Sequence, residues 1–115
     1  MPLTADDLTR DNGGWLFRDS GLDFRILADD ATPLMSLLQS LVNRSDSICA
    51  GARAHAESTP YASDIRDGNG ISPASIHIDP DSSYCIWFQL IEIPHRYLAV
   101  KFVDDAPVDV YCDHP

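Results

Sequence analysis

The most regular hydrophobic pattern in the sequence lies between Pro33 and Glu57. Its apolar positions recur at spacings of three, four and seven, which is the periodicity of an amphipathic helix. Thr32 followed by Pro33 is a favourable helix start, because a hydroxyl can cap the first turn and proline fits the first helical position. We therefore predict one long helix over Pro33–Glu57, with an apolar stripe formed by Leu34, Leu38, Leu41 and Ile48.

From residue 74 onward, the period of the pattern changes from helical to alternating. Short apolar runs separated by turn residues predict an antiparallel meander. Residues Tyr84–Ile93 are apolar at both odd and even positions, so this run is expected to be a central strand covered on both faces. The helix would cover one face, and the other would need the N-terminal segment, a dimer mate or a target. The four predicted strands are Ser75–Ile78, Tyr84–Ile93, Arg96–Val103 and Val108–Cys112.

The N-terminal part adds two short predicted strands, Trp15–Phe17 and Leu22–Leu27, around a turn at Asp19–Gly21. Residues Ser58–Pro73 are rich in Ser, Gly, Asp and Pro and are expected to form a loop of about 16 residues. No linker or repeat divides the chain. We predict a single α+β domain over residues 1–115, with one long helix packed on an antiparallel sheet of about four to six strands.

Charge is the feature that bears most on function. Eighteen acidic residues against eight basic ones give a formal net charge of −10. Residues 31–60, which contain the predicted helix, hold two acids and two bases, so the excess acid belongs to the rest of the chain. Such a surface repels nucleic acid and anionic membranes and attracts basic partners. Direct binding of DNA, RNA or membrane is therefore not expected.

Cysteine usage and the N-terminal residues indicate a reducing cytoplasm. Cys49, Cys85 and Cys112 are odd in number and widely spaced, which favours free thiols over a disulfide framework. Asp6 and Asp7 stand where a signal peptide would carry positive charge. The sequence also lacks a run of about 18 apolar residues, the length of a membrane-spanning helix.

Candidate catalytic and metal-binding motifs are weak. Residues 64–71 resemble a calcium loop, but the register puts isoleucine or serine where ligating and packing residues are required, so a tight turn is the better interpretation. His77, Asp79 and Asp81 follow ordinary strand alternation. The sequence has no nucleophile elbow and no glycine-rich phosphate loop. We expect no catalytic residue, cofactor or metal.

These observations predict a non-enzymatic binding protein that neutralises a partner with a basic, nucleic-acid-binding surface. Toxin immunity proteins and anti-CRISPR proteins are examples of that class. Two acidic clusters are the predicted contact sites: Asp64 and Asp67 with Tyr61 as an aromatic anchor, and Asp104 with Asp105. The alternative is an acidic secretion or assembly chaperone, and a small enzyme ranks third. Either a monomer or a homodimer fits the pattern.

Overall fold

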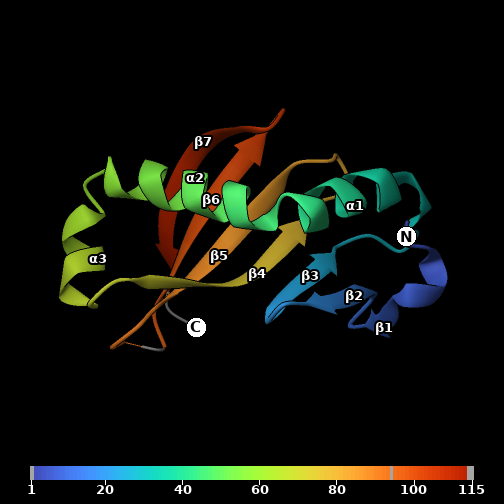
Figure 1. Cartoon of the computed structure of the whole chain (residues 1–115), viewed down its shortest axis with the longest axis horizontal. Helices are drawn as coiled ribbons and strands as arrows, with labels where there is room; N and C mark the ends of the chain where they lie inside the picture. The colour runs from blue at the N-terminus through green and yellow to red at the C-terminus, as the bar shows by residue number, and fades with distance from the viewer. Residues whose placement is uncertain (1, 94, 114–115) are drawn as a thin grey trace.

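The computed structural model describes residues 2–93 and 95–113. Within them, one seven-stranded sheet runs through the molecule with its strands in chain order (Figure 1). Its strands are β1 (Thr9–Asp11), β2 (Gly14–Asp19), β3 (Leu22–Ile26), β4 (Ile71–Ile78), β5 (Tyr84–Leu90), β6 (Tyr97–Val103) and β7 (Ala106–Asp113).

The sheet is mixed rather than purely antiparallel. β3 and β4 are parallel, with Phe24 paired to Ile76, and every other neighbouring pair is antiparallel. A parallel pair needs a crossover connection, and the helical segments supply it. They are η2 (Thr32–Leu34), α1 (Met35–Asn43), α2 (Ser45–Glu57) and α3 (Ala62–Asp67), while η1 (Ala5–Asp7) precedes the sheet.

The predicted fold class, with one long helix on an antiparallel sheet of four to six strands, is wrong. The sheet has seven strands, because β1 to β3 join it through β4 and extend it at one edge. The helical stretch is divided at Arg44, whose φ of −112° and ψ of 15° lie outside the helical range. Asn43 and Ser45 flank this residue, and both types compete with the helical backbone for hydrogen bonds.

The predicted loop over Ser58–Pro73 is also wrong in part. It contains the short helix α3 and the first residues of β4. Two isoleucines explain this result, since Ile65 and Ile71 are both buried. Each one fixes its segment on the hydrophobic core, and only short turns remain between the elements.

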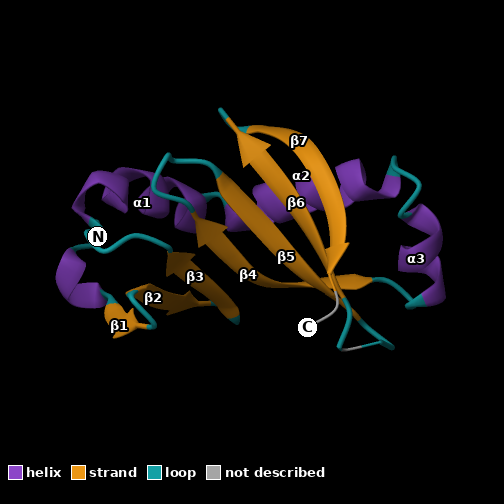
Figure 2. Ribbon diagram, turned by 180° about the vertical axis from the view of Figure 1, so that it is seen from behind, coloured by secondary structure: helices purple, strands orange, loops and turns teal. Residues whose placement is uncertain are grey.

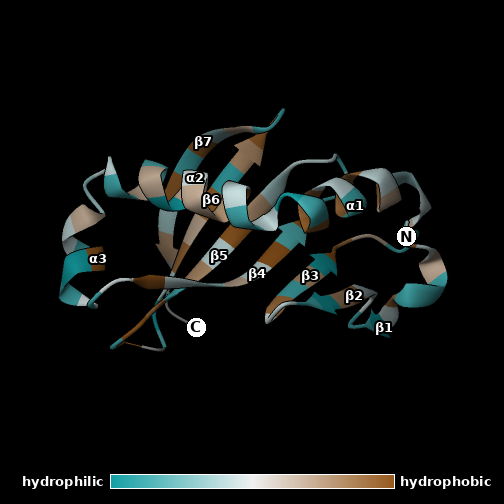
Figure 3. Cartoon of the chain, in the orientation of Figure 1, coloured by the Kyte–Doolittle hydropathy of each residue, from teal (hydrophilic) through white to brown (hydrophobic). Residues whose placement is uncertain are grey.

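The core lies between the helices and one face of the sheet. The helical stripe of Leu34, Leu38, Leu41 and Ile48 is buried, as the periodicity predicted. Hydrophobic residues gather along β4, β5 and β6 beneath the helices (Figure 3). The sheet contributes Phe24, Ile26, Ile76, Ile78, Ile86, Phe88, Leu90, Leu98 and Val100, all with at most 1% of their surface exposed.

The opposite face of the sheet has no helix over it in the described part of the chain (Figure 2). The N-terminal segment, one of three candidates to cover this face, instead lies in the plane of the sheet as β1, β2 and β3. We call this side the uncovered face. None of the described helices has the length and apolar character that spanning a bilayer requires.

Candidate partner-binding surfaces

Strand alternation determines which side chains lie on the uncovered face. In β4 to β6, residues such as Ile76, Ile86 and Val100 point to the core, so their neighbours along each strand point the other way. Pairing between strands then sets two rows across the uncovered face. One row runs Asp23, Ser75, Trp87, Ala99 and Tyr111, and the other runs Arg25, His77, Cys85, Lys101 and Asp109.

Four rings form a connected group on this face, which we call the aromatic cluster: His77, Trp87, Tyr97 and Tyr111. Trp87 is its centre, with ring centroids 5.7 Å from His77, 6.5 Å from Tyr97 and 5.8 Å from Tyr111. Both tyrosine contacts are edge-to-face, which is a favourable arrangement for aromatic pairs. Trp87 is only partly buried, so part of the indole faces solvent.

Two polar atoms of the aromatic cluster have uncharged partners. Ser75 Oγ lies 3.1 Å from His77 Nε2, and the Tyr111 hydroxyl lies 3.5 Å from Cys85 Sγ. Burial lowers the pKa of His77, and nearby Arg25 adds to this effect, while Asp79 and Asp23 oppose it. Burial and the contact with Cys85 raise the pKa of Tyr111. Both shifts favour the uncharged forms of His77 and Tyr111.

Ion pairs surround the aromatic cluster. Arg18 Nε lies 3.0 Å from Asp23, and Lys101 Nζ lies 3.9 Å from Asp79. Arg25 pairs with Asp11 and also approaches Asp23 at 3.9 Å. The Asp109 carboxylate forms no salt bridge with any described residue. It accepts one hydrogen bond, from the Val110 N–H at 2.9 Å. The unbalanced charge among these groups is thus negative.

The first predicted contact cluster lies on α3, at one end of the molecule (Figure 1). Tyr61 is half-buried and packs against the core, so its side chain is less available than a loop position would allow. Asp64 pairs with Arg96 at 3.2 Å and fastens α3 to the start of β6. Asp67 is exposed and has no salt bridge among the described residues.

The second predicted cluster is the turn between β6 and β7. Asp105 Oδ1 accepts a hydrogen bond from the Tyr84 hydroxyl at 2.7 Å and lies 3.5 Å from Arg44. The Tyr84 bond lowers the pKa of Asp105, and Arg44 acts in the same direction. Asp105 therefore holds the turn against the junction of α1 and α2. Asp104 is exposed and makes no salt bridge within the described chain.

The two predicted clusters do not form one surface. Asp64 contacts the chain just before β6 and Asp105 follows β6 directly, so the length of that strand, about 20 Å, separates them. Of the five predicted contact residues, only Asp67 and Asp104 are exposed carboxylates that make no salt bridge within the described part of the chain. Whether any of the five residues contacts a partner stays a prediction.

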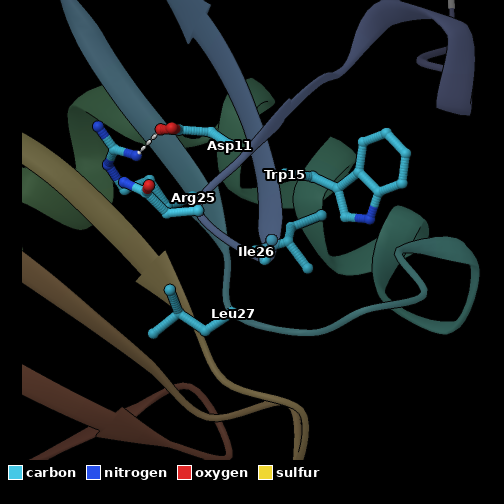
Figure 4. Close-up of a pocket in the computed structure, with 8 residues that line it drawn as sticks. Asp11, Trp15, Arg25, Ile26 and Leu27 are labelled. Carbon is cyan, nitrogen blue, oxygen red and sulfur yellow. Dashed lines mark hydrogen bonds and ion pairs between the residues drawn. The ribbon is translucent and has the colours of Figure 1, made fainter.

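A hollow of about 430 Å³ lies at the corner formed by β2 and β3. Asp11 and Arg25 lie together on one side of it, and Trp15 points away on the other (Figure 4). Three polar side chains here have partners: Arg25 pairs with Asp11, and Trp15 Nε1 donates to the Asp29 carbonyl at 3.0 Å. Arg10 also stacks 4.9 Å from the Trp15 ring centroid. The hollow lies beside the β2–β3 hairpin, and the groups that would most readily bind a ligand are already paired.

Metal-binding geometry is not found within residues 2–93 and 95–113: no three His, Cys, Asp or Glu side chains gather closely enough to hold an ion. The segment that resembled a calcium loop is the end of α3 and a tight turn, in which Asn69 and Gly70 have positive φ values of 59° and 99°. The turn interpretation is therefore right for residues 68–70 and wrong for Asp64–Asp67, which are helical.

Comparison with known proteins found no matching family model, no matching curated protein and no matching solved structure.

The aromatic cluster is the feature that sequence reasoning missed. Tyr84–Ile93 was predicted to be covered on both faces, but no described helix lies over the face that carries Trp87. One signal in the sequence could have revealed this face. The alternate residues Cys85, Trp87 and Gln89 of β5 include a polar side chain, whereas a strand buried on both faces would be apolar throughout. A fully covered face would not carry His77 and Lys101 in the same row.

Proposed function

We propose that the chain is a non-enzymatic binding protein of the cytosol that neutralises a partner with a basic, nucleic-acid-binding surface. The observation that carries this proposal is the surplus of free carboxylates. In the described part of the chain, salt bridges engage six of the eighteen acidic residues, namely Asp11, Asp23, Asp29, Asp64, Asp79 and Asp105. Exposed acids such as Asp6, Asp46, Asp67 and Asp104 face solvent without a cation.

A protein with this charge attracts cationic surfaces over distances beyond direct contact. Carboxylates that occupy the sites of phosphates would block nucleic-acid binding, as toxin immunity and anti-CRISPR proteins illustrate for the class. Steering of this kind accelerates association and weakens steeply with ionic strength.

A second candidate function is an assembly chaperone, and the uncovered face favours it. A sheet face with Trp87 at its centre offers apolar contact area to a client segment. Such binding would depend little on salt, because burial of apolar surface does not require charge.

The experiment is affinity capture from the native cell extract with the tagged protein, followed by reconstitution with the purified partner. We expect a basic protein whose association rate falls steeply with salt and whose nucleic-acid binding is lost on capture. The double variant Asp67→Asn with Asp104→Asn should slow association and flatten that salt dependence, whereas Tyr61→Ala should speed dissociation.

Salt-independent capture of an apolar client would replace the proposal with the chaperone function. A partner that retains full nucleic-acid binding in the complex would contradict it outright.

A further inference from the structure

The uncovered face combines an aromatic centre with a charged border, and we propose that it is the docking surface for a partner segment that presents arginine side chains. This inference rests on the proposed function, because it locates the contact with the basic partner. Protein interfaces commonly have this composition, with Trp and Tyr at the centre and polar groups at the border.

The geometry gives the aromatic cluster room to make contacts. Ser75 and Ala99, the direct neighbours of Trp87 on β4 and β6, are both small. The indole therefore contacts the rings of His77 and Tyr97 at diagonal positions and the ring of Tyr111 beyond Ala99, and it stays partly exposed. The strand backbones hold these rings in place, so little conformational entropy is lost on binding.

The charges on the uncovered face indicate which kind of partner segment can bind there. Arg18, Arg25 and Lys101 on this face each have a carboxylate partner within the chain. Asp109 on β7 and the exposed Asp81 in the β4–β5 turn make no salt bridge with the described residues, although both lie near Lys101. The acids on this side therefore outnumber the bases, and a cationic partner segment would balance that excess.

Arginine fits this surface better than lysine. A guanidinium group can stack on an aromatic ring and fork onto a carboxylate at the same time, whereas an ammonium group is a compact and strongly hydrated charge. The chain itself contains such a contact, with the Arg10 guanidinium 4.9 Å from the Trp15 ring centroid. An aromatic sheet face can also stack nucleic-acid bases, but the net charge of −10 opposes a polyanion.

The test uses Trp87 as its own reporter. Trp15→Phe in the full chain leaves Trp87 as the single tryptophan, so its fluorescence reports on the uncovered face. Oligoarginine and oligolysine peptides of equal length are titrated against this variant. We expect a saturable change in Trp87 emission, with oligoarginine binding about two- to fivefold more tightly than oligolysine.

Matched variants separate the face from the overall charge. Trp87→Ala and Asp109→Asn should each weaken oligoarginine binding, measured by anisotropy of labelled peptide. Asp46→Asn, which makes the same charge change on α2 across the sheet, should bind like wild type. Circular dichroism checks folding, and Trp87→Phe serves as the milder substitution if Trp87→Ala does not fold.

Each other outcome overturns the inference. Peptide binding with unchanged Trp87 emission, and equal losses for Asp109→Asn and Asp46→Asn, would leave the charge-based function standing while rejecting this face. Absence of binding to either peptide would reject both. Trp87 quenching by oligothymidylate alone would indicate a nucleic-acid platform, and dimerisation abolished by Trp87→Ala would indicate a second copy as the occupant.

Discussion

Two adjacent carboxylates in the β6–β7 turn have different surroundings. Both residues have positive φ, 53° at Asp104 and 61° at Asp105, which aspartate tolerates better than most residues. Both residues are exposed, but Asp105 accepts the Tyr84 hydroxyl and pairs with Arg44, whereas Asp104 makes no salt bridge within the described residues. At the scale of single residues, the same side chain type thus stabilises the fold at one position and has no cation partner at the next.

Tyr84→Phe tests the fold role of Asp105. Loss of the 2.7 Å hydrogen bond should lower the free energy of unfolding by about 1 kcal/mol at neutral pH. Because this bond lowers the pKa of Asp105, its stabilisation is present above the carboxyl's usual pKa and is lost as pH falls through the lowered value. Urea unfolding should therefore show wild type and variant converging below about pH 4. A difference that stays constant down to pH 2 would assign the effect to packing instead.

At the scale of elements, the crossover from β3 to β4 determines where the helices lie. It leaves β3, crosses one face of the sheet and returns parallel to β3, and α2 follows α1 along the long axis of the molecule, with the division at Arg44 (Figure 1). The helix stripe remains buried on both sides of that division.

Leu38→Ala and Leu41→Ala should each reduce the free energy of unfolding by about 2–5 kcal/mol, because both side chains are 0% exposed in the core. Leu27→Ala provides the matched control, since Leu27 is 46% exposed and should change stability little. Equal effects at all three positions in urea unfolding would contradict the packing of the stripe on the sheet.

Two glycine positions give opposite expectations. A Cβ at Gly14 would stand 2.3 Å from the Ile26 carbonyl oxygen, so Gly14→Ala should separate β2 from β3 and cost about 1–3 kcal/mol. A Cβ at Gly51, in α2, meets nothing within 4 Å, so Gly51→Ala should stabilise the protein by about 0.5–1 kcal/mol. Melting temperatures that shift in the same direction for both variants would contradict the strand packing at Gly14.

Local patterns predicted elements better than they predicted their assembly. The strands at Trp15 and Leu22, the C-terminal strands and the buried helix stripe all lie where periodicity placed them. The parallel pairing of β3 with β4 could not be predicted from local sequence patterns, because it joins residues far apart in the chain. The helix start was located, but its cap was not: Thr32 is the first residue of η2 rather than its cap, and its N–H donates to Asp30 Oδ1 at 3.0 Å.

The candidate site was predicted less well, because the sequence does not show which carboxylates form ion pairs or hydrogen bonds within the chain. Asp64 and Asp105 were chosen for their acidity, yet contacts with Arg96, Tyr84 and Arg44 engage them. Those contacts join segments distant in sequence. The sequence did indicate a sheet face in need of a cover, but it did not show the aromatic cluster on that face, since the four rings come from four strands.

At the scale of the whole molecule, the excess acidic side chains repel one another. A net charge of −10 on 115 residues favours expansion, and added salt screens that repulsion as the Debye length falls from about 10 Å at 0.1 M to about 3 Å at 1 M. Salt also weakens exposed ion pairs such as Arg18–Asp23, but these pairs contribute little to the free energy of unfolding. We expect the melting temperature to rise with sodium chloride over this range, and a fall would show that the ion pairs dominate.

The parallel pairing of β3 with β4 has a consequence for the order in which the chain acquires its structure during synthesis. β1, β2 and β3 leave the ribosome first, but the strand that attaches them to the sheet is made only after the whole helical crossover. The local contacts of β4 to β7 close short loops at low entropic cost, whereas β3 must close a long one. Pulsed hydrogen exchange during refolding should accordingly protect the amides of the C-terminal strands before those of the N-terminal hairpin. Until β4 appears, the nascent hairpin exposes Phe24 and Ile26, which makes the early chain a substrate for chaperones.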